Sequence, residues 1–237
     1  MDFSRFKVIT FDCYGTLIDW ETGIFGALRP VLGAHGKQLS DSELLQLYAE
    51  LEADAESGTF MNYRDVLKQV VRRSGERLGF RPTEQEICSL PDSLATWPAF
   101  PDTAAALRRL KSKYRLAIMS NIDDDLFANT RPKLGVELDA VITAQQAQAY
   151  KPSLKLFELA QKRIGADQRE WLHVGQSKYH DVAPAQSLKI STVWVNRPSP
   201  RSGGAAKTAD VRPDVEVASM AELAQMAVPA AELRSSA

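Results

Sequence analysis

The sequence predicts an α/β fold with a doubly wound parallel sheet as its core and an all-helical cap inserted into that core. Two observations predict the sheet. Short runs of β-branched residues alternate with helical segments after residue 97, and polar residues follow several of these runs directly. The cap is predicted from residues 18–97, which separate the first strand-like run from the next and show helical spacing throughout.

Composition excludes several classes of protein. The chain has 237 residues, of which 44% are hydrophobic and 25% charged, as in ordinary globular proteins. Lysine and arginine number 29 against 30 aspartates and glutamates, so the net charge of −1 favours neither nucleic acid nor an anionic membrane. Two cysteines, Cys13 and Cys88, are too few for a disulfide framework and lack the spacing of a zinc site.

The sequence also predicts where the protein acts. No segment approaches the roughly 18 consecutive apolar residues of a membrane span, and the N-terminus lacks the apolar region and cleavage site of a signal peptide. We therefore expect a cytoplasmic protein that acts on a small-molecule substrate, with neither nucleic acid nor membrane as a partner. Composition leaves open whether it forms a homodimer.

The first predicted strand spans residues 6–11 and ends at Asp12. Its run, Phe-Lys-Val-Ile-Thr-Phe, is rich in β-branched and aromatic residues, as expected of a buried central strand. In residues 18–97, by contrast, apolar side chains recur at helical spacing, as at Leu44, Leu45, Tyr48 and Leu51. We assign residues 1–17 and 98–226 to the core, residues 18–97 to the cap and residues 227–237 to a flexible tail.

Strands and helices alternate through the rest of the chain. The predicted elements are a helix at 103–111, strands at 116–119 and 140–142, a helix at 154–164, a strand at 171–174, a helix ending near 187, a strand at 192–195, a loop at 197–214 and a helix at 219–226. Units of this length imply parallel strands, whose ligands bind outside their carboxyl ends.

Polar side chains follow the predicted strands at these carboxyl ends. They are Asp12 after the first strand, Ser120 and Asn121 after the second, Lys151 in the loop after the third, and Ser177 and Asp181 after the fourth. A single such residue is usually a turn or helix-capping residue. Four strands that deliver polar groups to one edge of a sheet indicate a functional site instead.

Asp12 is the candidate nucleophile. Gly15 permits a tight turn after it, and the hydroxyl of Thr16 could hydrogen-bond the carboxylate or a bound anion. Carboxylates form covalent esters and acyl-phosphates, which split a difficult displacement into two steps. Lys151 would balance the charge, although a lysine before a proline can also be a solvated surface residue.

The other strand ends offer binding groups. Ser120 and Asn121 could bind an oxyanion together with the backbone N–H groups of the following helix. The acidic run at residues 123–125 is interpreted as capping that same helix. Asp181 could orient water or hold a metal beside Asp12, and its alternative role is helix capping.

Some residues near these motifs are interpreted as structural. They are the buried or strand-borne side chains of Cys13, Trp171, His173 and Trp194. His180 adjoins Asp181, so both a role in the site and a structural role stay open for it.

Four short motifs occur in order along the chain: Asp12-Cys13-Tyr14-Gly15-Thr16-Leu17, Ser120-Asn121, Lys151-Pro152 and Asp181. In this order and spacing they resemble the four motifs of the haloacid dehalogenase superfamily, and in particular those of its L-2-haloacid dehalogenase branch. The resemblance extends to about Pro198. It implies a Rossmann-like core, a helical cap between the first two motifs and Asp12 as the nucleophile.

Two departures from the superfamily's phosphatases bear on cofactors. Those enzymes carry an aspartate as general acid two residues after the nucleophile, where this chain has Tyr14. They also hold Mg²⁺ with acidic residues of the fourth motif, where Gln176 supplies a neutral amide. A hard cation binds less tightly when a carboxylate is lost. The resemblance to the dehalogenase branch, which has an aromatic residue at this position, implies no metal and no other cofactor.

The chain departs from the dehalogenase branch as well. Those enzymes bind the substrate carboxylate with a cap arginine, but this chain has none between Arg29 and Arg64, so one of these two or neither would substitute. Phe157 stands where the branch has a tyrosine, and Gln176 and Lys178 replace a serine and an asparagine. These differences bear on the identity of the substrate.

The favoured hypothesis is a metal-independent hydrolase that cleaves carbon–halogen bonds through an ester of Asp12. The predicted catalytic residues are Asp12, Lys151 and Asp181, and the predicted substrate-binding residues are Tyr14, Thr16, Ser120, Asn121 and Ser177. A Mg²⁺-dependent phosphatase of small phosphate monoesters and a non-catalytic binding protein are the alternatives. The fold by itself does not choose among them.

Overall fold

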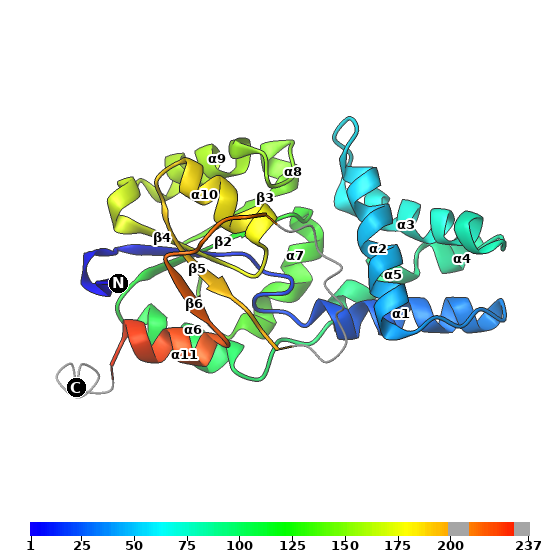
Figure 1. The fold of residues 1–237 in the computed structure, drawn as a ribbon, viewed down its shortest axis with the longest axis horizontal. Coiled ribbons are helices and arrows are strands. Elements are labelled where there is room, and N and C mark those ends of the chain that lie inside the picture. The colour runs from blue at the N-terminus through cyan, green and yellow to red at the C-terminus, as the bar shows by residue number, and fades with distance from the viewer. Residues whose placement is uncertain (199–208, 230–237) are drawn as a thin grey trace.

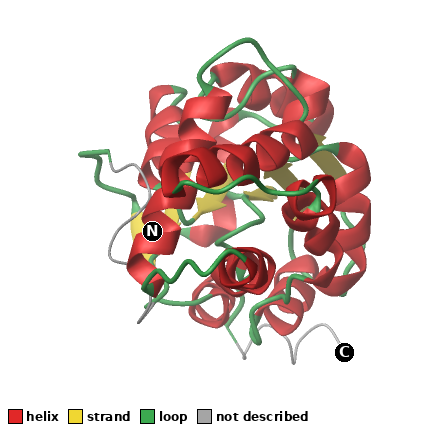
Figure 2. Ribbon diagram, turned by 90° about the vertical axis from the view of Figure 1, so that its right-hand side faces the viewer, coloured by secondary structure: helices red, strands yellow, loops and turns green. Residues whose placement is uncertain are grey.

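A computed structural model describes residues 1–198 and 209–229 of the chain. A parallel sheet with helices on both of its faces forms one part of the molecule, and a cluster of helices lies beyond one end of the strands (Figure 1). Viewed from the side of that cluster, the helices stand in front of the sheet (Figure 2). Both the doubly wound sheet and the all-helical cap predicted from the sequence are present.

The sheet has six parallel strands in the order β3-β2-β1-β4-β5-β6. They are β1 (Val8–Phe11), β2 (Arg115–Ser120), β3 (Ala140–Thr143), β4 (Trp171–Gly175), β5 (Ser191–Val195) and β6 (Val215–Val217). Strand β1 lies at the centre, and Phe11 pairs with Ile118 on one side and Val174 on the other. Helices cover both faces, so all four residues of β1 are buried.

Helices flank the sheet above and below in Figure 1. Helices α8 (Ala144–Ala147), α9 (Leu154–Ile164) and α10 (Ala183–Ser187) lie on one face, and α6 (Thr103–Lys111) and α11 (Met220–Ala227) pack together on the other. Helix α7 (Asp124–Thr130) follows β2 at the end near the cap. A π-helical turn at Lys178–Val182 precedes α10. Periodic apolar residues placed α6 and α9 correctly from the sequence.

The cap consists of α1 (Trp20–Ala34), α2 (Asp41–Glu56), α3 (Tyr63–Leu78), α4 (Glu84–Ile87) and α5 (Ser89–Ser93). A capping box of Ser40 and Glu43 starts α2. A left-handed residue, Gly79, ends α3. Helices α2 and α3 pack against each other through buried apolar side chains and form the body of the cap. No helix in the described ranges is long and apolar enough to cross a bilayer.

Asp123 joins the core to the cap. Its carboxylate accepts hydrogen bonds from the backbone N–H groups of Tyr63 (2.8 Å) and Arg64 (2.9 Å), which begin α3. Asn62, the residue before α3, makes no capping hydrogen bond with its side chain, so a residue of the core satisfies these free donors instead. The sequence predicted that the side chain of Asp123 would cap the N-terminus of the helix that follows it. That prediction is wrong, because the carboxylate instead caps a helix that is distant in sequence.

The C-terminal region contains a strand that the sequence pattern did not predict. Strand β6 has three residues, and only Val217 among them is buried. So short an edge strand leaves too little alternation to detect. Of the predicted loop at 197–214, residues 199–208 lie outside the described part, as do residues 230–237 of the predicted tail.

Two glycines of α1 give a matched test of how closely the cap packs. A Cβ added at Gly23 would lie 2.2 Å from the Trp97 ring, whereas one added at Gly26 would meet nothing within 4 Å. We expect Gly23→Ala to lower the free energy of unfolding by about 1–3 kcal/mol through overpacking. Gly26→Ala should raise it by roughly 0.5–1 kcal/mol, because alanine favours the helix. Urea denaturation measures both, and equal stabilities would contradict the close contact with Trp97.

Candidate active site

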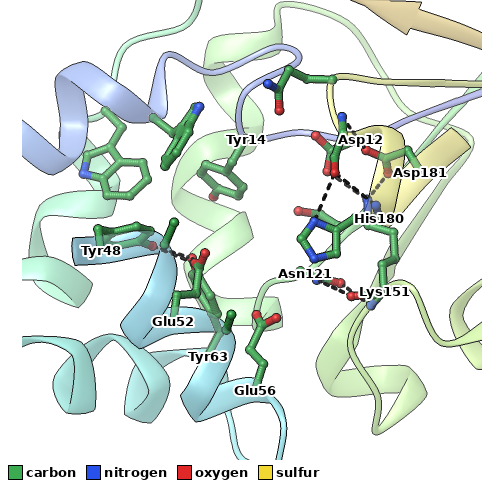
Figure 3. A pocket seen from close by; sticks show the side chains of 17 residues that line it. Asp12, Tyr14, Tyr48, Glu52, Glu56, Tyr63, Asn121, Lys151, His180 and Asp181 are labelled. Carbon is green, nitrogen blue, oxygen red and sulfur yellow. Dashed lines mark hydrogen bonds and ion pairs between the residues drawn. The ribbon is translucent and has the colours of Figure 1, made fainter. Parts of the chain in front are cut away.

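A cavity of about 130 Å³ lies between the carboxyl edge of the sheet and the cap. The strand ends contribute Asp12, Lys151, His180 and Asp181 from one side, and the cap contributes Tyr48, Glu52, Glu56 and Tyr63 from the other (Figure 3). All of the predicted site residues except Thr16 line it, and Thr16 contacts Asp12 directly. The parallel sheet thus brings together residues that are far apart in the sequence.

The turn after β1 positions Asp12. Gly15 adopts φ +95°, a conformation that side-chain-bearing residues rarely take, and the chain turns back after it. Thr16 then donates its hydroxyl to Asp12 Oδ2 (2.8 Å) and accepts the backbone N–H of Gln176 (3.0 Å). The Thr16 hydroxyl therefore orients the candidate nucleophile, and it also connects the turn after β1 to the end of β4 by a hydrogen bond.

Lys151 is the centre of the charged network. Only 2% of the residue is exposed, and its Nζ donates to Asp12 Oδ1 (2.9 Å), to Asp181 Oδ1 (2.6 Å) and to the carbonyl of Met119 (3.0 Å). An ammonium group removed from water needs compensation of this kind. The alternative interpretation of Lys151 as a solvated surface lysine is wrong.

Asn121 holds Lys151 in place. Its Oδ1 accepts the backbone N–H of Lys151 (2.7 Å), and its Nδ2 donates to the Lys151 carbonyl (3.2 Å). Both polar ends of the amide are therefore engaged with the backbone of one residue. Because Asn121 also lines the cavity, it connects the substrate space to the position of the lysine.

Asp181 is supported from behind by His173. The carboxylate accepts the Ser177 backbone N–H at Oδ2 (3.2 Å), and His173 Nε2 lies 3.2 Å from Oδ1. An ionised carboxylate only accepts, so Nε2 is the donor in this contact, and the other ring nitrogen, Nδ1, lies 2.8 Å from Thr10 Oγ1. A Cβ at Gly175 would lie 2.4 Å from Asp181 Cγ, so the strand end must be glycine.

These contacts set the protonation of the network. Burial raises the pKa of Asp12; the Lys151 ammonium opposes this rise and the Asp181 carboxylate adds to it. Burial would raise the pKa of Asp181 too, but Lys151 and His173 outweigh it and hold that pKa well below its usual value. The two carboxylates in turn raise the pKa of Lys151 despite its burial. Lys151 therefore stays charged, and Asp181 stays ionised.

Tyr14 presents its ring to the cavity, while its hydroxyl turns away. The hydroxyl lies 2.8 Å from Thr130 Oγ1, and the ring meets Trp97 edge to face at a centroid distance of 5.8 Å. Burial raises the pKa of Tyr14 well above its usual value, so this residue adds no charge beside Asp12. The position that holds an acid in related phosphatases is neutral in this protein.

The cap wall was not predicted from the sequence. It comprises the aromatic residues Trp20, Tyr48, Tyr63 and Trp97 and the acids Glu52 and Glu56. Tyr48, Glu52 and Glu56 follow at intervals of four in α2 and so share one face of the helix. That spacing could have indicated a shared face of the helix. It does not distinguish a face that lines a cavity from an acidic face exposed to solvent.

Glu52 forms a small network with two tyrosines. Its Oε1 accepts the hydroxyls of Tyr48 (2.8 Å) and Tyr63 (2.5 Å), and these hydroxyls lie 2.9 Å from each other. Burial raises the pKa of Glu52 above its usual value, and the hydroxyls of Tyr63 and Tyr48, which bond to the charged form, offset only part of that rise. Both tyrosine hydroxyls donate to Oε1, so this oxygen acts as an acceptor.

Neither candidate cap arginine reaches the cavity. Arg64 pairs with Asp125 (2.6 Å), and Arg29 pairs with Asp41 on the outside of the cap. Phe157 packs in the core against Trp171 and His173, and Lys178 lies over the Trp194 ring. Of the residues that differ from the dehalogenase branch, Gln176 lines the cavity.

Residues on the core side of the cavity also differ from expectation. His180, left open by the sequence, lines the cavity. Arg197 does not line it, but donates to the Thr16 carbonyl (2.9 Å) and pairs with Asp102 (3.0 Å). Cys13 and Trp171 are buried, as predicted. His173 is buried too, but its contact with Asp181 gives it a positioning role that no sequence pattern indicated.

The residues of the site do not form a cage for a metal ion. Within the described residues, no group of three or more His, Cys, Asp and Glu side chains is arranged to hold a metal. Asp12 and Asp181, the two carboxylates at the sheet edge, share the Lys151 ammonium. The positive charge between these two carboxylates is therefore an ammonium group of the protein itself.

A buried acid–lysine pair at the carboxyl edge of a capped, doubly wound sheet defines a capped α/β hydrolase. The chain belongs to the haloacid dehalogenase-like hydrolase family, whose model matches residues 6–188. This finding confirms the family resemblance predicted from the four motifs.

Individual relatives include both chemistries considered above. (S)-2-haloacid dehalogenase of Pseudomonas fluorescens is 25% identical over 226 residues, which cover 92% of this chain and 95% of that protein. Glyceraldehyde 3-phosphate phosphatase of Methanothermobacter thermautotrophicus is 32% identical over 100 residues, 41% of this chain and 44% of that one. The structure of L-2-haloacid dehalogenase from Xanthobacter autotrophicus with chloropropionic acid covalently bound has a TM-score of 0.79 at 20% identity, and covers 95% of this chain and 99% of its own. That likeness shows a shared fold.

Removing the lysine tests whether it holds the network together. Lys151→Met leaves two carboxylates buried side by side, and breaking a buried pair in this way costs about 3–5 kcal/mol of unfolding free energy. We also expect the pKa of Asp12 to rise further, since Lys151 is its main stabilising charge. Denaturation and NMR titration of labelled aspartate carboxyls measure the two effects.

The control for this variant is Lys155→Met, which removes an exposed lysine four residues away and should change stability by no more than about 0.5 kcal/mol. Lowering the pH should narrow the difference between Lys151→Met and wild type. Asp181 has a lowered folded pKa, so its contribution is present at neutral pH and is lost as it protonates. A difference in the free energy of unfolding between Lys151→Met and wild type that does not change with pH would contradict the charge network.

Proposed function

We propose that this protein is a metal-independent hydrolase that displaces halide from a saturated carbon through an ester of Asp12. The observation that carries the proposal is the surroundings of Asp12. A lysine ammonium lies 2.9 Å from its carboxylate, and the ring of Tyr14 stands in the cavity wall where the superfamily's phosphatases carry their general acid. The named activity of the Pseudomonas relative supports the same chemistry.

In the first step the Asp12 carboxylate attacks the halogen-bearing carbon. A C–O bond forms as the carbon–halogen bond breaks, and the halide leaves with the bonding pair. Lys151 favours the ionised form of Asp12, and Thr16 holds Oδ2 so that the carboxylate is oriented before the substrate arrives. Aromatic rings of the cavity wall place apolar surface around the reacting carbon, where a carboxylate is less solvated than in bulk water.

In the second step water attacks the carboxyl carbon of the ester. The tetrahedral intermediate expels the substrate oxygen, which takes up one proton of the water, and Asp12 is regenerated. Halide and one proton are released to solvent, so a halide and water become an alcohol and a hydrohalic acid. Asp181, kept ionised by Lys151 and His173, would orient the water as a hydrogen-bond acceptor.

A phosphatase is the second candidate, since one relative carries that name over 41% of this chain. The same Asp12 would then form an acyl-phosphate. That reaction needs an acid to protonate the leaving group and a cation to offset the phosphoryl charge. Tyr14 and Gln176 stand at the relevant positions, which favours carbon–halogen chemistry.

Loss of the carboxylate should abolish turnover. Asp12→Asn keeps the shape of the side chain but removes its charge, so halide release should fall to less than about one percent of wild type. In a single turnover with enzyme in excess in H₂¹⁸O, the label should enter Asp12, because water attacks the carboxyl carbon. Mass spectrometry of the peptide that contains Asp12 reads this directly. Label found only in the product would rule out the ester.

Metal dependence separates the two candidates. EDTA should leave halide release unchanged, and Tyr14→Asp should lower it, because a second carboxylate would repel Asp12 and raise its pKa. Tyr14→Phe keeps the ring and is the matched control, with activity within several-fold of wild type. The panel contains haloacids, haloamides and phosphate monoesters, each with Mg²⁺ or EDTA. Hydrolysis of phosphate esters alone, and only with Mg²⁺, would establish the phosphatase instead.

A further inference from the structure

Acidic side chains outnumber basic ones in the cavity. Four acids line it, Asp12, Glu52, Glu56 and Asp181, together with two basic residues, Lys151 and His180. The Lys151 ammonium already bridges two of the four acids, at 2.9 and 2.6 Å. A substrate carboxylate would therefore enter a space where the cation is committed and two further acids face it from the cap (Figure 3).

Glu52 is arranged to accept hydrogen bonds from a ligand. Both tyrosine hydroxyls, of Tyr48 and Tyr63, donate to its Oε1. Its second oxygen, Oε2, accepts no hydrogen bond from any residue in the described part of the chain. A head group that occupies the cap side of the cavity thus meets acceptor oxygens, and an acceptor such as a carboxylate finds no complementary donor on Glu52.

The rest of the cap wall favours the same kind of head group. Tyr48 and Trp20 are adjacent, with ring centroids 6.0 Å apart, and Trp97 closes the wall against Tyr14. Aromatic faces attract cations and the positive edges of N–H groups, and they repel carboxylates. No arginine lines this cavity among the described residues.

We propose that the cap wall selects halogenated substrates with an N–H donor head group, a carboxamide or an ammonium, and disfavours 2-haloacids. Glu52 is the specificity-determining residue, and Glu56 lies one helical turn further along the same face of α2. The inference rests on the proposed carbon–halogen chemistry, because the core edge supplies the reaction and the cap supplies the choice of substrate.

Chloroacetamide and chloroacetate make a matched pair for the test. They have nearly the same size and both activate the carbon through a carbonyl, but one carries N–H donors and the other a negative charge. We expect kcat/KM for chloroacetamide to exceed that for chloroacetate by at least about 100-fold, as like-charge juxtaposition predicts. Equal values, or a preference for chloroacetate, would overturn the proposal.

Substitution of Glu52 tests the assignment to that residue. Glu52→Gln removes the charge but keeps an oxygen for the two tyrosines. The ratio of kcat/KM for chloroacetamide to kcat/KM for chloroacetate should therefore fall by at least about 10-fold. Asp54→Asn makes the same change of charge on an exposed residue of α2 outside the cavity and should leave the ratio within about twofold. If Glu52→Gln does not fold, Glu56→Gln serves as the second variant. An unchanged ratio in the folded variants would overturn the proposal.

A binding measurement separates this proposal from the proposed reaction. Ethylammonium and propionamide should raise the Tm of the wild-type protein in a dose-dependent way, and propionate should not. If no chlorinated compound releases halide, the proposed reaction fails, and the Tm shifts still decide the head group. Stabilisation by propionate alone would overturn the head-group assignment whatever the reaction.

Discussion

The ammonium group of Lys151 is buried between two carboxylates, and the arrangement of the site depends on that placement. One acid comes from the turn after β1 and the other from the turn after β4, so the lysine links the central strands at their carboxyl ends. Three buried charges are tolerated because each has a partner at hydrogen-bonding distance. The same pairing keeps Asp181 ionised and favours the charged form of the buried Asp12.

The neighbours of these charges do the positioning. Asn121 holds the backbone of Lys151, Thr16 holds one oxygen of Asp12, and His173 supports Asp181. Each is itself bonded to another strand or turn, so a shift of one charged group would break several contacts. Such pre-organisation is what a displacement at carbon requires, since the nucleophile gains most from fixed orientation and exclusion of water.

Core and cap contribute different chemistry. The edge of the sheet provides a nucleophile with its counter-charge, an arrangement that suits many substrates. The cap provides aromatic faces and the acids Glu52 and Glu56, which determine what head group the cavity accepts. The hydrogen bonds of Asp123 to the start of α3 fix the cap relative to the core, so the acidic wall and the nucleophile face each other across a small space. Family membership describes the first part, and the proposed choice of substrate rests on the second.

The sequence by itself determined the α/β core, the inserted cap and the charged groups at the sheet edge. Parallel strands of one sheet place their carboxyl ends at the same edge, so the positions of Asp12, Lys151 and Asp181 follow from local patterns. Only the tertiary structure decided what faces them. The orientation of the Glu52 side chain depends on how α2 packs and on a hydrogen bond to a residue outside that helix. The contact of His173 with Asp181 depends on which strands are neighbours in the sheet. Short-range periodicity shows which face of an element is apolar, but it does not show what that face or its opposite will meet, because those contacts join residues far apart in sequence.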